Sequence, residues 1–149
     1  MKSLAKYILF ISIITLLTNC GDPEPTPQPA IDLEQATIDG LAKTWTISGV
    51  SLDGASVASD WAGVSISFTT SKSFTVSGLS TQNSLIWPST GTYSFPDANK
   101  PLKVLRNDGI EITISNLTEN SATLGFAITG RTGGRQDGLT GNYSFTFNN

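Results

Sequence analysis

The sequence predicts an all-β protein, an eight-stranded antiparallel up-and-down meander closed into a barrel, with one short helix at its start. Apolar residues alternate with serine and threonine at a period of two along most of the chain, which is the pattern of half-buried strands. Every predicted connection has twelve residues or fewer, so successive strands are expected to be antiparallel neighbours. Eight strands suit a small closed barrel without free edges, and a two-sheet β-sandwich is the alternative.

The predicted strands carry large apolar side chains on one face. In the first strand, 44–52, these side chains change parity at Gly49, so we expect a β-bulge there. An Asp108-Gly109 turn predicts a hairpin between two later strands. The inward residues expected in the other seven strands are Val64, Ile66 and Phe68; Phe74 and Val76; Tyr93 and Phe95; Leu102 and Val104; Ile110, Ile112 and Ile114; Leu124, Phe126 and Ile128; and Tyr143, Phe145 and Phe147.

A short helix is predicted just before the first strand. Ile38, Leu41, Ala42 and Trp45 follow one another at helical spacing. Asp32 or Thr37 can cap the amino terminus of this helix. We expect the helix to plug or flank the start of the sheet.

The amino terminus has the pattern of a lipoprotein signal peptide, residues 1–19. Two lysines precede an uncharged apolar run, 7–17, that is too short for a membrane-spanning helix, which needs roughly 20 residues. Cys20, the only cysteine, follows this run and is the expected lipidation site, although Asn19 stands where a small residue is usual. An ordinary secretory signal is the alternative. We therefore expect a lipid anchor in the outer membrane, on its periplasmic face or at the cell surface.

A proline-rich tether, 20–30, separates this anchor from the barrel domain, 31–149. Proline occupies every second position from 23 to 29, which favours an extended polyproline II stalk of roughly 30 Å. A proline motif that binds another protein is the alternative interpretation.

Charge and composition exclude several function classes. Removal of Lys2 and Lys6 with the signal leaves a net charge of 7 − 12 = −5, which argues against nucleic-acid binding. The chain has no histidine, so Ser-His-Asp catalysis and histidine-ligated metal sites are excluded. Carboxylate chemistry and oxygen-ligated calcium remain open. We expect a monomer without a cofactor.

The lengths of the loops suggest where a ligand binds. In a meander the long connections 53–63, 80–90 and 130–141 lie at one end of the barrel, and short connections nearly shut the other. Binding residues usually lie on such long loops. The candidate ligand-binding residues of this rim are Trp61, Leu85, Trp87, Arg131 and Arg135.

Each of these candidates has a structural alternative. Both tryptophans can instead fold back and cap the barrel core. The glycines of segment 130–135 look like an anion cradle, but they also serve to bend a long loop. Asp53, Asp60 and Asp137 lie on the same rim, where a carboxylate pair suits glycoside hydrolysis. The same aspartates are also ordinary turn formers.

Three segments resemble the lipocalin-like lipoproteins of Gram-negative bacteria: 41–45 at the start of the first strand, 87–95 and 138–145. Lipocalins open their first strand with Gly-x-Trp, which Trp45 matches while Lys43 replaces the glycine. The resemblance covers residues 38 to 147. It implies a barrel that holds a small apolar molecule in its calyx. Our leading hypothesis is therefore a non-enzymatic, membrane-anchored protein that takes up a small hydrophobic or amphipathic ligand in the barrel or at its rim. The alternatives are a surface module for glycans or proteins and, last, a carboxylate-based hydrolase.

Overall fold

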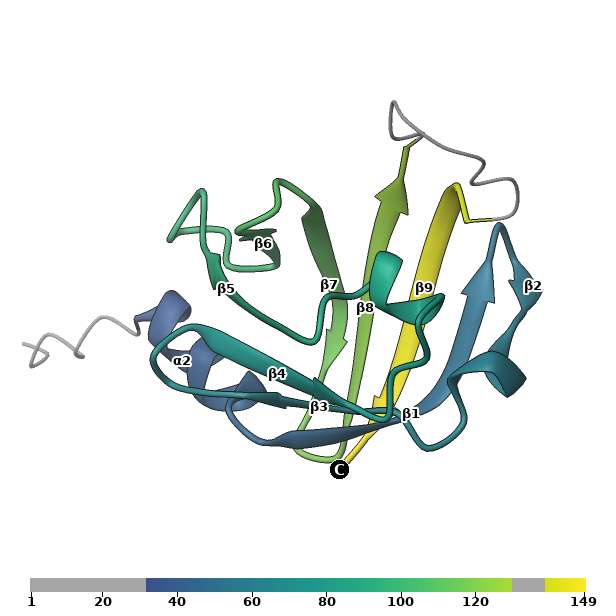
Figure 1. Ribbon diagram of the computed structural model, residues 1–149. Coiled ribbons are helices and arrows are strands. Elements are labelled where there is room, and N and C mark those ends of the chain that lie inside the picture. Colours follow the sequence, from purple (N-terminus) through teal and green to yellow (C-terminus); the bar gives the residue numbers. More distant parts are fainter. Residues whose placement is uncertain (1–31, 130–138) are drawn as a thin grey trace, which may run out of the picture. The chain divides into compact units, whose positions relative to one another are not determined.

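The computed structural model describes residues 32–129 and 139–149. The signal peptide, Cys20 and the tether lie outside the described residues, as do Arg131, Arg135 and Asp137. The elements follow one another as α2 (Leu33–Leu41), β1 (Thr44–Leu52), β2 (Ala55–Ser56), η2 (Ala58–Trp61), β3 (Ser65–Phe68), β4 (Ser73–Ser77), η3 (Asn83–Leu85), β5 (Thr90–Ser94), β6 (Lys103–Arg106), β7 (Glu111–Leu117), β8 (Ser121–Ile128) and β9 (Gly141–Asn148) (Figure 1).

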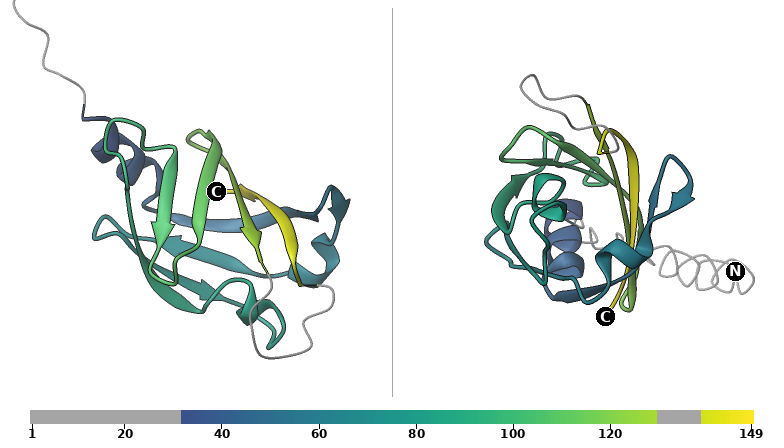
Figure 2. Two further views of the ribbon diagram at one scale, coloured as in Figure 1. Left: turned by 90° about the horizontal axis from the view of Figure 1, so that it is seen from above. Right: turned by 45° about the vertical axis from the view of Figure 1, so that its right-hand side comes forward.

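The strands form one antiparallel sheet that closes on itself. Their order is β2-β1-β3-β4-β5-β6-β7-β8-β9, and β1 also pairs with β9. Eight of the strands therefore make a closed up-and-down barrel, visible as a ring in the right view of Figure 2. The predicted lipocalin-like fold class is confirmed. The short strand β2, which pairs only with the end of β1, was not predicted because two residues carry no alternation.

Strand β1 closes the barrel by pairing on both of its sides. Its first residues pair with β3, and residues Thr46 to Leu52 pair with β9. The register shifts between Ile47 and Gly49, which leaves Ser48 as the extra residue of a β-bulge. The hydroxyl of Ser48 donates to the carbonyl of Thr146 at 3.1 Å. The bulge that the parity change predicted is therefore confirmed.

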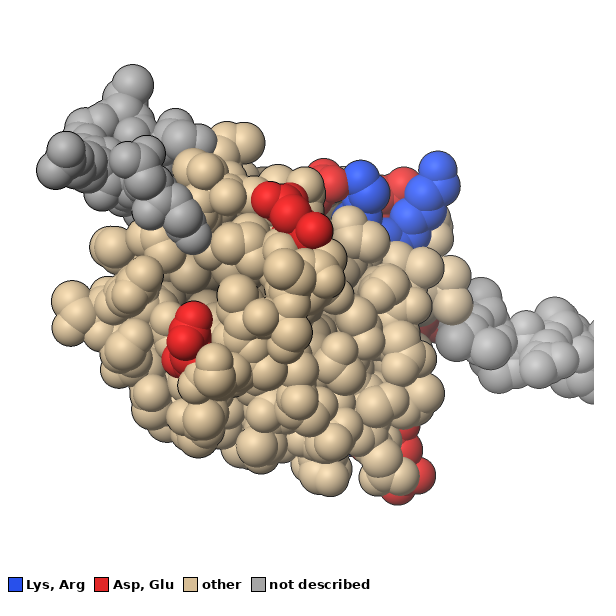
Figure 3. Space-filling view, turned by 90° about the vertical axis from the view of Figure 1, so that its right-hand side faces the viewer, with Lys and Arg blue, Asp and Glu red and all other residues tan. Residues whose placement is uncertain are grey.

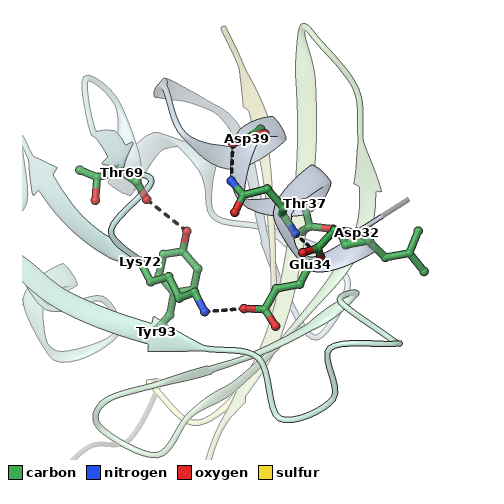
Figure 4. Close-up of polar contacts among 9 residues, drawn as sticks. Asp32, Glu34, Thr37, Asp39, Thr69, Lys72 and Tyr93 are labelled. Carbon is green, nitrogen blue, oxygen red and sulfur yellow. Dashed lines mark hydrogen bonds and ion pairs between the residues drawn. The ribbon is translucent and has the colours of Figure 1, made fainter. Parts of the chain in front are cut away.

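Helix α2 flanks the start of β1, as expected. Asp32 caps the helix by accepting a hydrogen bond of 3.0 Å from the backbone N–H of Gln35. The indole N–H of Trp45 donates to the carbonyl of Leu41 at 2.9 Å, and this bond holds the end of the helix against the barrel. Near the start of the helix, Glu34 forms an ion pair with Lys72 of the β3–β4 turn (Figure 4).

Aromatic side chains from neighbouring strands fill the barrel. The rings of Phe126 and Phe145 are stacked with centroids 5.4 Å apart, and Phe145 and Phe147 follow at 6.1 Å. On the opposite wall Phe68 lies 6.1 Å from Phe74. The outward face is largely serine and threonine, and the face seen in Figure 3 carries only a few scattered charges. The alternation predicted from the sequence thus separates an aromatic interior from a polar exterior.

Candidate functional site

The barrel mouth, where the long loops lie, is closed by side chains from those loops. Trp61 belongs to η2 and Trp87 to the β4–β5 loop, and both are fully buried. Trp61 makes an edge contact with Phe145 at 4.7 Å. Trp87 makes edge contacts with Phe126 at 5.2 Å and with Phe145 at 5.3 Å. The expectation that both rings are displayed at an open rim is wrong, because they cap the core as the alternative interpretation predicted.

A buried asparagine ties these two loops together. The side-chain amide of Asn83 donates to the carbonyl of Asp60 at 2.6 Å, and its backbone N–H donates to the hydroxyl of Ser80 at 3.1 Å. Buried polar groups need such partners to offset the loss of water. The β4–β5 loop is therefore held in place over the mouth as a packed structure.

Arg106 is the one charged residue among the buried residues that the structure describes. Its Nε donates to Asp108 at 3.0 Å, a second nitrogen bonds the same carboxylate, and Nη1 donates to the carbonyl of Ile86 at 3.2 Å. Burial alone would raise the pKa of Asp108. The hydrogen bond and charge of Arg106, with the backbone N–H of Ile110, outweigh burial and lower this pKa below its usual value.

Three of the remaining rim candidates lie in the described part of the chain, each in a different turn or short helix. Leu85 is 46% exposed on η3. Asp53 accepts hydrogen bonds from the backbone N–H and the side chain of Asn142, which lower its pKa. It lies in a left-handed turn with φ 48°, so its position follows from turn formation. Asp60 accepts a long bond of 3.4 Å from Ser59. Arg131 and Arg135 lie outside the described residues.

An open groove instead lies at the end of the barrel where β1 begins. Its volume is about 1020 Å³. It runs between helix α2, the β5–β6 loop and the start of the β7–β8 turn, segments that the meander brings to the end with short connections. The β3–β4 and β7–β8 connections at this end are short, as expected, and the groove lies on the surface beside α2. We call this site the α2 groove. Its lining residues are Leu33, Ala36, Thr37, Gly40, Lys43, Asn99, Lys100, Pro101, Leu102, Lys103, Thr113, Ile114, Leu117, Thr118 and Glu119.

The α2 groove has an aliphatic surface with polar groups around it. None of the described residues that line it is aromatic, whereas the barrel interior is rich in rings. Lys43 donates to the backbone carbonyl of Glu119 at 2.9 Å, and Lys103 pairs with Glu111 at 2.6 Å. Lys100 makes no ion pair within residues 32–129 and 139–149. Such a site suits a flexible apolar body with a polar or anionic head.

Sequence reasoning missed this groove, although one signal pointed to it. Leu33, Ala36 and Gly40 are spaced as one helical stripe, separate from the buried stripe that contains Ile38 and Leu41. Leu102 was expected to point inward with Val104, but β6 begins one residue later and leaves Leu102 exposed.

The same alternation that buries Val104 also buries Arg106, a charged residue at an inward position.

The described residues contain no cluster of three side chains suited to hold a metal ion. Within the same ranges, none of the helices is both long enough and apolar enough to span a bilayer. Comparison of the chain with protein-family models, with curated proteins and with solved structures gave no significant match.

Proposed function

We propose that the protein is a lipid-anchored binding protein, related to the lipocalin-like lipoproteins, that holds a small amphipathic molecule in the α2 groove. The observation that supports this function is the groove itself. Its volume of about 1020 Å³ is comparable with that of small-molecule sites, which extend to about 1,000 Å³. Its lining is mainly aliphatic, with lysine and threonine at its edges.

The barrel interior is a poorer site for this ligand. Trp87 fills the space that a calyx ligand would take, in contact with Phe126 and Phe145. A ligand there would first have to displace a packed indole ring and the loop that carries it. The α2 groove needs no such rearrangement, so we assign the ligand to the groove.

The proposed anchor is the lipid on Cys20. Acyl chains contribute about 0.8 kcal/mol of membrane affinity for each buried methylene, so an acylated chain stays with the membrane. Cys20→Ser is expected to move the protein from the membrane fraction to the soluble fraction. Retention of this variant in the membrane would contradict the proposed anchor.

Binding can be tested with anilinonaphthalene sulfonate, a fluorescent probe with an apolar body and an anionic head. Ala36 is exposed and lines the groove, so Ala36→Phe fills the site without disturbing the core. Gln35→Phe is the matched control, because Gln35 is exposed on the same helix but does not line the groove. We expect Ala36→Phe to weaken probe binding at least about tenfold, and Gln35→Phe to change it less than about twofold.

Two results would overturn the proposal. The first is that the unmodified chain shows no saturable probe fluorescence. The second is that Ala36→Phe binds the probe as tightly as the unmodified chain does. Native mass spectrometry of the chain purified from membranes adds a second readout. We expect a bound apolar molecule in the unmodified protein and its loss in Ala36→Phe.

A further inference from the structure

Two exposed leucines stand at the edges of the α2 groove. Leu33 is 49% exposed on the first turn of α2, and Leu102 is 59% exposed in the β5–β6 loop. Both line the groove, so their side chains extend its apolar surface outward. Large apolar side chains gathered beside a groove are typical of a surface that contacts a lipid or another molecule. The other large hydrophobic residues that are exposed in the described chain, Leu85 and Leu105, do not line it.

The chain enters the domain at this same edge. Asp32, the cap of α2, directly precedes Leu33, and Cys20 lies twelve residues before Asp32 in the sequence. The intervening prolines favour an extended tether of roughly 30 Å. A tether this short keeps the domain at a high effective concentration near the bilayer, so even a weak contact is populated.

Charge does not select the lipid at this end. Lys43, Lys100 and Lys103 line the groove together with Glu119, and Lys103 is paired with Glu111. Because both signs are mixed, contact with a bilayer is expected to depend on the leucines. Lysine side chains near a bilayer extend their ammonium groups toward the headgroups.

We propose that this end of the barrel rests on the bilayer that holds the Cys20 lipid, with Leu33 and Leu102 inserted at its surface. The proposal rests on the lipid anchor and the groove proposed above. In this position the groove opens next to the bilayer, so an apolar ligand can pass from the membrane into the groove without crossing water. The bilayer is therefore the proposed source of the ligand.

The test uses the full acylated chain in phosphatidylcholine vesicles. Cys20 is the only cysteine of the chain, and in the acylated protein its thiol is blocked. A single introduced cysteine can therefore be labelled selectively with an environment-sensitive fluorophore. The labelled positions are Leu102→Cys and, as a matched control, Leu85→Cys, an exposed leucine of the β4–β5 loop. We expect quenching by spin-labelled phosphatidylcholine to be at least about threefold stronger at position 102 than at position 85.

Equal quenching at the two positions, or none at position 102, would overturn the docking proposal. Vesicles that also contain phosphatidylglycerol should give the same pattern, and docking that requires this anionic lipid would contradict the role of the leucines. Ala36→Phe separates the two proposals. If the probe no longer binds to this variant while position 102 is still quenched, docking does not depend on an open groove. If the probe binds to the unmodified chain while position 102 is not quenched, only docking fails.

Discussion

The guanidinium group of Arg106 lies 5.3 Å from the centre of the Trp87 ring. A strand residue and a loop residue are therefore in contact over the barrel mouth. Arg106 also bonds the carbonyl of Ile86, next to Trp87, so one side chain fixes both the ring and the backbone of the β4–β5 loop. Cation–π contacts of this kind are strongest where water is excluded.

Replacing Arg106 should destabilise the protein strongly. Arg106→Ala removes a buried side chain together with its hydrogen bonds to the partly exposed Asp108 and to the Ile86 carbonyl, a loss expected to cost about 2 kcal/mol or more. Lys103→Ala is the matched control, because Lys103 and Glu111 form an exposed pair that contributes less than about 1 kcal/mol. Urea unfolding measures both changes, and equal losses would contradict the importance assigned to Arg106.

Acid should weaken the protein through Asp108. Its folded-state pKa is lowered, so its stabilising effect is present above the unfolded value of about 3.9 and is lost as the pH falls through the folded pKa. Asp108→Asn should make stability less dependent on pH below about 4. Asp53 also has a lowered pKa, so part of the dependence should remain. Urea midpoints measured from neutral pH downward test this, and an unchanged slope would refute it.

Alkali should weaken the protein through Tyr93. Burial raises the pKa of its phenol to about 12, so the folded state binds the proton more tightly than the unfolded state does. The stabilising effect is complete below the unfolded pKa of about 10 and is lost as the pH rises toward the folded value. Tyr93→Phe should reduce the loss of stability above about pH 10, measured by urea unfolding. A fall as steep as in the unmodified protein would show that Tyr93 is not its cause.

Trp87 should behave as a core residue. Trp87→Ala is expected to cost about 4 kcal/mol, because it leaves a cavity among aromatic rings. Within the described residues its indole N–H has no hydrogen-bond partner. Trp87→Phe removes this unsatisfied donor, so it should cost less than about 1.5 kcal/mol. Leu85→Ala on the same loop is exposed and should be nearly neutral. Thermal and urea unfolding rank the three variants, and a small loss for Trp87→Ala would contradict a packed mouth.

Gly78 should tolerate no side chain. Its φ is +81°, and a Cβ atom at this position would lie 2.5 Å from the carbonyl oxygen of Gly63. Gly78→Ala combines left-handed strain with a backbone clash, so it should cost more than about 2 kcal/mol. Gly54 has a similar φ of +85° with no atom within 4 Å. Gly54→Ala should therefore cost only about 1 kcal/mol, from the backbone strain alone. Similar losses would show that the contact between the loops is not tight.

The parts of the fold that could be predicted are those that depend on alternation. The bounds of β1, its bulge next to Gly49 and the inward position of Phe145 all follow from a period of two in the sequence. Short connections then order the strands as a meander. Each step uses neighbours in the chain, so one sequence is sufficient.

The candidate site could not be predicted in the same way. Trp61 and Trp87 lie in loops, where no periodicity tells whether a ring points into the barrel or into solvent. The α2 groove is formed by segments distant in sequence, such as Ala36 and Leu117. Its volume depends on the gap that remains when α2 packs against the barrel, and this gap is a property of the tertiary structure.

Strand β1 has a further consequence for the order of events in folding. Its partner β9 comes from the far end of the sequence, and bringing such distant segments together carries a large loop-closure cost and slows folding. A chain that crosses a membrane unfolded and amino terminus first cannot form this pairing until β9 has emerged. In a protein exported in this way, β1 would keep one edge unpaired until β9 arrives, and the barrel would close late, after translocation is nearly complete.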